Sequence, residues 1–138
     1  MPAPRYFGYN YPFWTPPGVV LVPQADARII KNDLLQLLLT SPGERRMRPT
    51  YGTEIRKFPF EPGDDQSIES LRQSIRLAIN QFEQRVILKS IVLTLDADNS
   101  SLAIGVFCAL SRDPNIDLAV ELVTVNPATI VPTQQAIV

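Results

Sequence analysis

The chain has 138 residues, of which 45% are hydrophobic and 20% are charged, so it has the size of one domain that buries roughly two thirds of its unfolded surface. Its formal net charge of −1 excludes the excess of Lys and Arg with which nonspecific nucleic-acid binders neutralise phosphates. Because the chain contains no histidine, His-dependent nucleophilic catalysis and His-ligated metal sites are excluded, and we expect no cofactor.

The first 24 residues combine prolines with aromatic residues. Proline at this density excludes a helix and disfavours a central strand, because it lacks the backbone N–H donor. Aromatic side chains such as Tyr11 and Trp14 are costly to leave in water, which argues against a simple disordered linker. The sequence therefore predicts an extended arm over residues 1–24, whose rings pack on its own domain, on a neighbouring protein or on both. Tyr11 and Trp14 are candidate partner-binding residues.

Residues 26–39 are predicted to form the first helix, with Asp26 as its N-cap or first-turn acid and Pro42-Gly43 as its stop. One face carries apolar residues at helical spacing, namely Ala27, Ile30, Leu34, Leu37 and Leu38. Leu35 and Leu39 widen that face, so the helix is either central to the core or covered on a second side by another chain.

Residues 40–63 are rich in Pro and Gly, which indicates a loop with room for one short strand or hairpin near residues 53–58. Between residues 44 and 57 this loop carries five basic residues against two acidic ones, a local excess of three positive charges. Guanidinium groups favour bidentate contacts with carboxylates, so the cluster indicates an acidic protein partner; a solvated loop is the alternative. The candidate docking residues of this loop are Glu44, Arg45, Arg46 and Arg48.

A second helix is predicted from Asp64 or Asp65 to about Phe82, because apolar residues repeat there at intervals of three and four. The helix is followed by Glu83 and Arg85, which bring two opposite charges to the boundary with the next element. These two residues form either an internal or exposed salt bridge, or a contact with a partner.

From Val86 onward the apolar pattern changes to a period of two. Three alternating runs, at residues 91–95, 102–110 and 116–122, are separated by turn-forming residues and predict a three-stranded antiparallel meander. Cys108 lies within the second run and is the only cysteine, which indicates a small buried side chain and suits a reducing compartment.

Two helices before a meander, without alternation of strands and helices, predict an α+β domain whose helices cover one face of the sheet. The predicted organisation is an arm over residues 1–24, a domain over residues 25–126 and a tail over residues 127–138. The last strand, ending near Val125, is expected to be an edge that offers unpaired backbone groups to another chain, with Val120 and Leu122 as candidate contacts.

The order of motifs after the first helix resembles the gene-25-like family, the small baseplate wedge proteins of contractile phage tails and related injection machines. The resemblance runs from about Ile29 to Leu95. Its motifs are Pro42-Gly43-Glu44-Arg45, Met47-Arg48-Pro49, Tyr51-Gly52 and Phe60-Glu61-Pro62. It implies a structural subunit that acts by assembly rather than by catalysis, so no catalytic residue is expected.

The resemblance also implies partners. In the type VI secretion relatives, a Glu-Pro-Arg motif at the position of residues 83–85 is associated with docking onto the helical core bundle of the wedge. Glu83 and Arg85 match that motif, whereas Gln84 replaces the proline and its rigidity. The expected partners are other wedge proteins and the tail sheath protein, which the chain would anchor as a sheath initiator through its terminal strands. Several copies per baseplate are expected, without strong self-association and without a nucleic-acid or membrane partner.

No stretch approaches the roughly 20 apolar residues that cross a bilayer, and residues 1–6 lack the pattern of a secretory signal. We therefore expect assembly in the host cytoplasm, followed by a place in the tail baseplate of the particle.

Two further hypotheses remain at this point. Some members of the resembled family carry lysozyme names, and a glycoside hydrolase would need two carboxylates roughly 5 to 9.5 Å apart across a sugar cleft. The loop and the start of the second helix supply Glu44, Glu54, Glu61, Asp64 and Asp65, although N-capping accounts for the last two. The other hypothesis is an adaptor whose aromatic arm binds a peptide.

Overall fold

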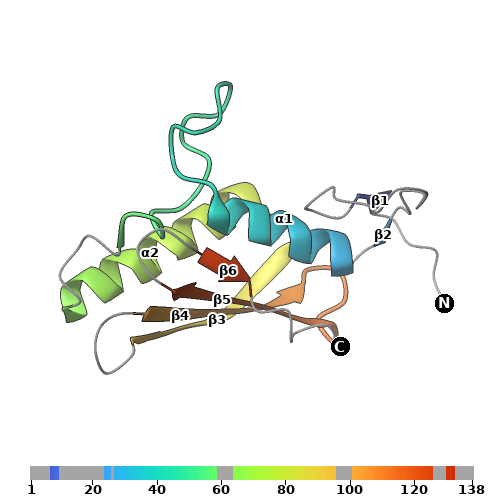
Figure 1. The fold of residues 1–138 in the computed structure, drawn as a ribbon. Helices are drawn as coiled ribbons and strands as arrows, with labels where there is room; N and C mark the ends of the chain where they lie inside the picture. The colour runs from blue at the N-terminus through green and yellow to red at the C-terminus, as the bar shows by residue number, and fades with distance from the viewer. Residues whose placement is uncertain are drawn as a thin grey trace, which may run out of the picture.

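The computed structural model describes residues 7–9, 24–25, 27–58, 64–95, 101–125 and 130–132. Two helices lie on one face of an antiparallel sheet, and a long loop between the helices projects away from both layers (Figure 1). This arrangement confirms the predicted α+β fold.

Helix α1 spans Ala27–Leu39 and presents its apolar face to the core. Its buried residues are Ile29, Ile30, Leu34, Leu37 and Leu38. In the last turn of the helix, both the backbone N–H and the hydroxyl of Thr40 donate to the carbonyl oxygen of Gln36, at 3.1 and 2.6 Å. Asp26, the predicted N-cap, lies outside the described residues.

Helix α2 spans Asp65–Phe82 and starts where the sequence predicts. Asp64 is its N-cap, because its carboxylate accepts a hydrogen bond of 2.9 Å from the backbone N–H of Ser67. Hydrogen bonding from the side chain of Ser67 and from its backbone N–H lowers the pKa of Asp64, because it favours the charged carboxylate. At the other end, the N–H of Glu83 closes the last turn by donating to Ile79.

The main sheet contains the three predicted strands in sequence order, β3 (Val86–Leu95), β4 (Ser101–Leu110) and β5 (Asp117–Val125). A register shift between Leu88 and Ser90 marks an irregularity in β3. The third strand begins one residue later than predicted. Ile116 belongs to the preceding turn, since its N–H donates to Asp113 at 3.0 Å, and its side chain is exposed rather than packed in the core.

A fourth strand, β6 (Ile130–Pro132), was not predicted. It pairs antiparallel with β5, with Leu122 opposite Pro132 and Thr124 opposite Ile130. The sequence-based expectation that the last strand of the meander forms an open edge is therefore wrong for residues 122–124, whose free side is occupied by a segment from the predicted tail. Among the described residues, residues 117–121 of β5 have a strand only on the β4 side.

The two ends of the predicted arm also pair with each other, which the sequence did not indicate. Strand β1 (Phe7–Gly8) lies antiparallel to β2 (Gln24–Ala25) in a separate two-stranded sheet. Gly8 packs against α1 so closely that an added Cβ would lie 3.2 Å from Cδ1 of Ile29. The described base of the arm is thus held on its own domain, and the rest of the arm, including Tyr11 and Trp14, lies outside the described residues.

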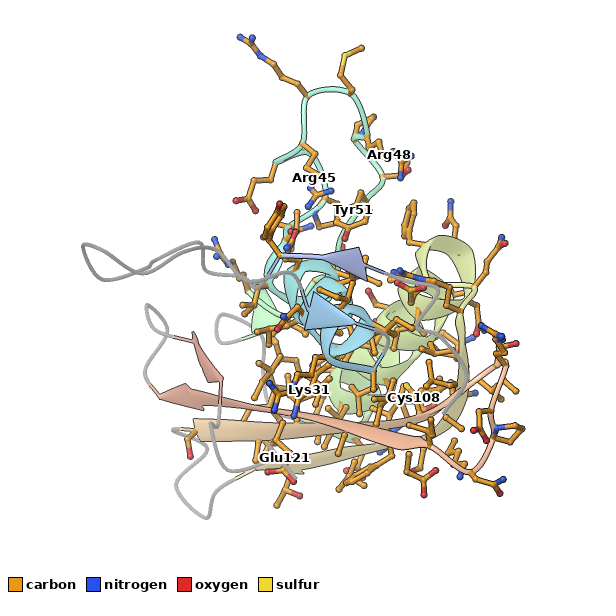
Figure 2. All side chains as sticks on the ribbon, turned by 90° about the vertical axis from the view of Figure 1, so that its right-hand side faces the viewer. Lys31, Arg45, Arg48, Tyr51, Cys108 and Glu121 are labelled. Atoms are coloured by element: carbon orange, nitrogen blue, oxygen red, sulfur yellow. The ribbon has the colours of Figure 1, made fainter. Side chains whose placement is uncertain are left out.

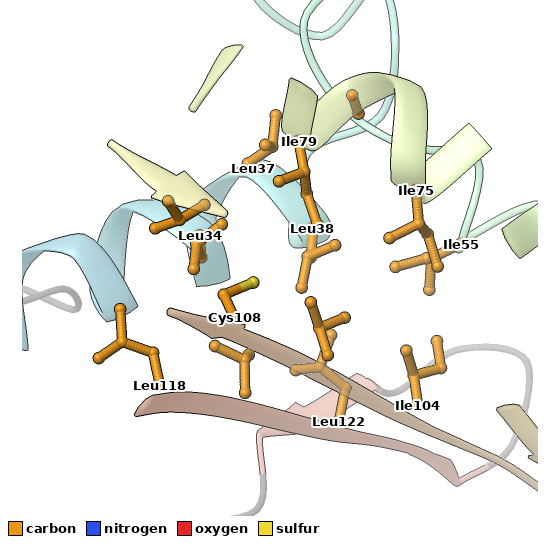
Figure 3. Packing of buried hydrophobic residues seen from close by; sticks show 14 of the residues in the cluster. Leu34, Leu37, Leu38, Ile55, Ile75, Ile79, Ile104, Cys108, Leu118 and Leu122 are labelled. Atoms are coloured by element: carbon orange, nitrogen blue, oxygen red, sulfur yellow. The ribbon is translucent and has the colours of Figure 1, made fainter. Parts of the chain in front are cut away.

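The core lies between the helices and the inner face of the sheet (Figure 3). Leu34 and Leu38 from α1 meet Ile75 and Ile79 from α2 above alternate residues of β4 and β5, as the period of two requires. Cys108 belongs to this cluster, and burial raises the pKa of its thiol to about 11. The thiol therefore stays protonated and unreactive at neutral pH.

Candidate docking surface

The loop of residues 40–58, here called the docking loop, projects from the end of α1 as the most prominent extension of the described chain (Figure 1). Its base is closed by backbone hydrogen bonds from Thr53 to Thr40 at 2.9 Å and from Gly43 to Pro49 at 2.7 Å. The buried hydroxyl of Thr53 donates to the carbonyl oxygen of Leu38 at 2.8 Å, which fastens the loop to the end of α1. The predicted strand or hairpin near residues 53–58 is replaced by turns.

Gly52 makes this closure possible. Its φ of 126° lies in a region that side chains rarely adopt, and an added Cβ would lie 2.3 Å from the carbonyl oxygen of Thr40. The Tyr51-Gly52 pair of the sequence motif therefore has a structural reason, because only glycine lets the two backbone segments approach this closely.

Arg45 and Tyr51 brace the middle of the docking loop (Figure 2). The guanidinium carbon of Arg45 lies 4.1 Å from the centre of the Tyr51 ring, and one of its nitrogens donates to the side-chain oxygen of Gln36 at 3.2 Å. The Tyr51 ring is buried and packs against Phe82 of α2 with ring centres 5.1 Å apart. Burial raises the pKa of Tyr51, and the nearby Arg45 charge partly opposes that rise.

Glu44 also serves the loop itself, because its carboxylate accepts a hydrogen bond of 2.9 Å from the backbone N–H of Ser41. Beyond it the chain makes a turn in which the N–H of Arg48 donates to the carbonyl oxygen of Arg45 at 3.2 Å. Arg46 and Met47 are the two central residues of that turn. Of the predicted docking residues in this loop, Glu44 and Arg45 therefore have internal partners. Arg46 is exposed in the terminal turn, and Arg48 is exposed beside that turn on the side of Tyr51 (Figure 2).

The second predicted cluster, Glu83 and Arg85, lies in the connection between α2 and β3, here called the junction. Arg85 donates from Nε to Glu83 at 2.6 Å, contacts the same carboxylate again through Nη2, and also bonds Asp33 of α1 at 2.7 Å. These two carboxylates raise the pKa of Arg85, against the effect of its partial burial. The side chain of Glu83 is only 7% exposed.

The junction is thus an internal ion-pair network, which was one of the two possibilities left open by the sequence. Its third member, Asp33, was missed by sequence reasoning, because it lies 52 residues away from Arg85 along the chain. The carbonyl oxygen of Arg85 also accepts from Ser111 at 2.8 Å, so the same short segment connects α1, α2 and the turn after β4.

Val120 and Leu122, the candidates on the last strand, point into the core and are 2% and 0% exposed. Any contact that β5 makes with another chain must therefore use its backbone or the outward-facing side chains. Glu121 is one of these outward-facing side chains, and it lies near Lys31 of α1 (Figure 2). Burial lowers the pKa of Lys31, and the Glu121 carboxylate partly opposes that decrease.

Three of the four described carboxylates considered for a hydrolase have other partners; the fourth, Asp65, lies in the first turn of α2, and Glu61 lies outside the described residues. Glu44 and Asp64 hold backbone N–H groups, and the exposed Glu54 pairs with Lys57 at 3.0 Å. Within the described ranges, no group of three or more Cys, Asp or Glu residues could hold a metal ion. Neither of the two described helices has the length and apolar character needed to span a membrane.

The projecting loop and the fold around it match a known family over residues 24–115, that of the baseplate wedge protein gp25. The chain belongs to this family. Its role is accordingly that of a structural component of a contractile-tail baseplate, which confirms the resemblance seen in the sequence. No curated protein sequence matches the chain.

Solved structures show the same fold. A chain of the anti-feeding prophage baseplate is 26% identical, with a TM-score of 0.69 over 77% of this chain and 86% of that one. A Geobacter sulfurreducens protein that carries the name tail lysozyme is 21% identical, with a TM-score of 0.63 over 83% and 95% of the two chains. A chain of the pyocin R2 baseplate after contraction is 18% identical, with a TM-score of 0.63 over 77% and 99%. The last two likenesses show a shared fold alone.

Proposed function

We propose that this protein is a noncatalytic wedge subunit that docks onto another baseplate protein through its docking loop and anchors the first ring of tail sheath. One observation carries the docking part of the proposal. The loop is fastened at its base by Thr53 and Gly52 and braced by Arg45 on Tyr51, yet its outer end presents arginines to solvent. A loop held in one conformation loses little entropy on binding, which favours recognition.

The partner surface proposed for this loop is acidic. Arg46 and Arg48 are both exposed, and guanidinium groups bind carboxylates with two parallel hydrogen bonds. Association of this kind weakens with ionic strength, because salt screens exposed charges over about 10 Å at 0.1 M. The proposed wedge partner is therefore a baseplate protein with clustered Asp and Glu on its surface.

The test is charge reversal at the outer end of the loop, in the variant Arg46→Glu with Arg48→Glu. Tails assembled in cells with this variant are expected to lack the subunit, while the isolated variant keeps the melting temperature of the wild type. Arg56→Glu with Lys57→Glu reverses the same amount of charge nearer the base of the loop and is the matched control. Normal incorporation of the Arg46/Arg48 variant into tails contradicts the docking role.

For sheath anchoring, we propose strand addition at the β5 side of the sheet. The backbone of residues 117–121 has a strand on the β4 side alone among the described residues, and the three-residue β6 covers the remainder. β6 is the outermost strand on this side, and a strand from a sheath subunit can pair with it and continue along residues 117–121 of β5. We also propose that residues 1–24 form an arm, residues 25–126 the domain, and residues 127–138 a tail that contains β6.

Deletion of residues 127–138 tests this second part. The expected result is a baseplate that still contains the subunit but assembles little or no sheath, as seen by electron microscopy of purified particles. Fully sheathed tails with the truncated subunit contradict strand addition at β5. If the truncated subunit is absent from the baseplate, residues 127–138 are instead needed for wedge assembly. That result would remove the support for a separate sheath contact.

We further propose that the protein is present in several copies per baseplate, without strong self-association, and is assembled in the host cytoplasm. Glu83 and Arg85 enter the proposal as residues that hold the junction in shape for a wedge partner, because their own contacts are internal. Sedimentation of the purified protein as a monomer at micromolar concentration, with several copies in each imaged baseplate, is the expected result.

A further inference from the structure

One of the two central residues of the loop's terminal turn is apolar. The Arg48-to-Arg45 hydrogen bond closes that turn and makes Arg46 and Met47 its outermost residues. Met47 is 93% exposed, the highest exposure among the large hydrophobic side chains described as exposed, and much higher than that of Leu77 at 59%.

The turn chemistry does not account for methionine at this position. Central turn positions favour Gly, Pro, Asn, Asp and Ser, whose side chains or backbones suit the turn itself. Met47 offers none of these advantages and presents an apolar side chain to water. Methionine is, however, enriched at protein interfaces, because its unbranched thioether adapts to irregular apolar pockets.

Contacts within the docking loop hold the turn that carries Met47 in a defined position. Residues 40–53 are joined by the Thr40 and Thr53 hydrogen bonds, and Arg45 lies on the Tyr51 ring directly before the turn. The described residues around the turn show no hydrogen bond or ion pair to the side chains of Arg46 or Met47. The outer end therefore combines a free guanidinium and a free apolar side chain on a support that is held by the core.

We propose that Met47 is the anchor of the docking loop and inserts into an apolar pocket on the partner, with carboxylates at the pocket's rim that bind Arg46 and Arg48. This inference rests on the proposed docking function and deepens it. The arginines provide steering and orientation, whereas burial of Met47 provides affinity, since desolvated anchors surrounded by a polar rim dominate many interfaces. Arg45 and Glu44 act as positioning residues that shape the loop.

The experiment is a competition in cells that express the complete tail. An epitope-tagged variant is co-expressed with the untagged wild type, and the ratio of the two in purified particles is divided by their ratio in the lysate. Met47→Gln keeps the size and flexibility of the side chain but makes it polar, and its incorporation is expected to fall about tenfold, in line with loss of one buried apolar side chain. Met47→Leu is expected to stay within about twofold of the wild type.

Leu77→Gln is the matched control, because it makes the same kind of change at an exposed apolar residue of α2. It is expected to be incorporated like the wild type. Equal incorporation of Met47→Gln and wild type overturns the inference, and so does an equal loss for Met47→Leu or Leu77→Gln. If Met47→Gln is incorporated normally but Arg46→Glu with Arg48→Glu is not, the anchor role of Met47 is rejected and the docking function stands. If both variants are incorporated normally, the anchor role and the docking function are both rejected.

A crosslinking experiment identifies the pocket. Benzoylphenylalanine at position 47 is activated by light in assembled particles, and the crosslinked peptide is sequenced by mass spectrometry. The expected peptide comes from another baseplate protein and contains apolar residues with Asp or Glu nearby. A crosslink to a Lys- or Arg-rich segment, or no crosslink within intact particles, contradicts the proposed pocket.

Discussion

The docking loop and the junction are both clusters of charged residues, yet the structure uses them in opposite ways. At the junction, the guanidinium of Arg85 is shared between Glu83 and Asp33, and the Glu83 carboxylate is almost fully buried. At the outer end of the docking loop, Arg46 and Met47 extend from a turn into solvent. The difference shows that charge identifies a cluster, while burial and the presence of an opposite charge decide whether it stabilises the fold or remains free for a partner.

This comparison implies that mutational effects on stability decrease from the junction to the outer end of the loop, whereas effects on assembly increase in the same direction. Four substitutions test the first part of this gradient on the isolated protein by urea denaturation.

The largest effect is expected at the junction. Arg85→Ala leaves the buried Glu83 carboxylate without its ion-pair partner, so the free energy of unfolding should fall by about 3 kcal/mol. Lys57→Ala, which breaks the exposed pair with Glu54, is the control and should change it by less than about 1 kcal/mol. Similar small losses for both variants would show that the junction network is not structural.

A smaller effect is expected at the base of the docking loop. Gly52→Ala forces a side chain into a positive-φ conformation and against the carbonyl oxygen of Thr40, so we expect a loss of about 2 kcal/mol. Gly43→Ala is the control, because Gly43 also has positive φ but an added Cβ meets no atom within 4 Å. A loss at Gly43 as large as at Gly52 would assign the effect to φ alone and remove the role of close approach.

In the middle of the loop, Arg45→Ala removes the cation–π contact with Tyr51 and the hydrogen bond to Gln36. The expected loss is about 1 kcal/mol, since such contacts near the surface contribute modestly. Arg45→Lys keeps the charge but not the planar stacking and should recover only part of that loss. An unchanged unfolding free energy for Arg45→Ala would mean that the loop is not braced at this point.

At the outer end, Arg46→Ala should change the unfolding free energy by less than about 0.5 kcal/mol, because the side chain has no described partner to lose. The same variant should weaken incorporation into tails, which Arg45→Ala affects only through the shape of the loop. A clear loss of stability for Arg46→Ala would place this residue with the junction and contradict the division between the two clusters.

Much of the fold could be predicted from local patterns. The spacing of apolar residues gave both helices, and Asp64 acts as the predicted N-cap. The period of two gave β3, β4 and β5 with the correct inner face, because alternate side chains of a strand necessarily face opposite sides. The family also followed from short motifs, of which Tyr51-Gly52 proved to have a direct steric reason.

Two errors are local, namely the strand or hairpin predicted near residues 53–58 and the start of β5, but the omissions concern contacts between separate segments. β6 is three residues long and has no pattern of its own, so only its pairing with β5 makes it a strand. The pairing of β1 with β2 joins residues on either side of the proline-rich segment, and the contact of Asp33 with Arg85 joins α1 to the junction. None of these pairs leaves a local periodic signal.

By itself, the sequence determined the two helices and the three long strands, which of their faces are apolar, and where positive charge is concentrated, since these properties depend on neighbouring residues alone. The tertiary structure decided which charged groups are neutralised by others and which stay free, because that depends on distances between segments brought together by folding. It closed the junction with Asp33, partly covered β5 with β6, and left Arg46 and Met47 exposed at the end of a braced loop.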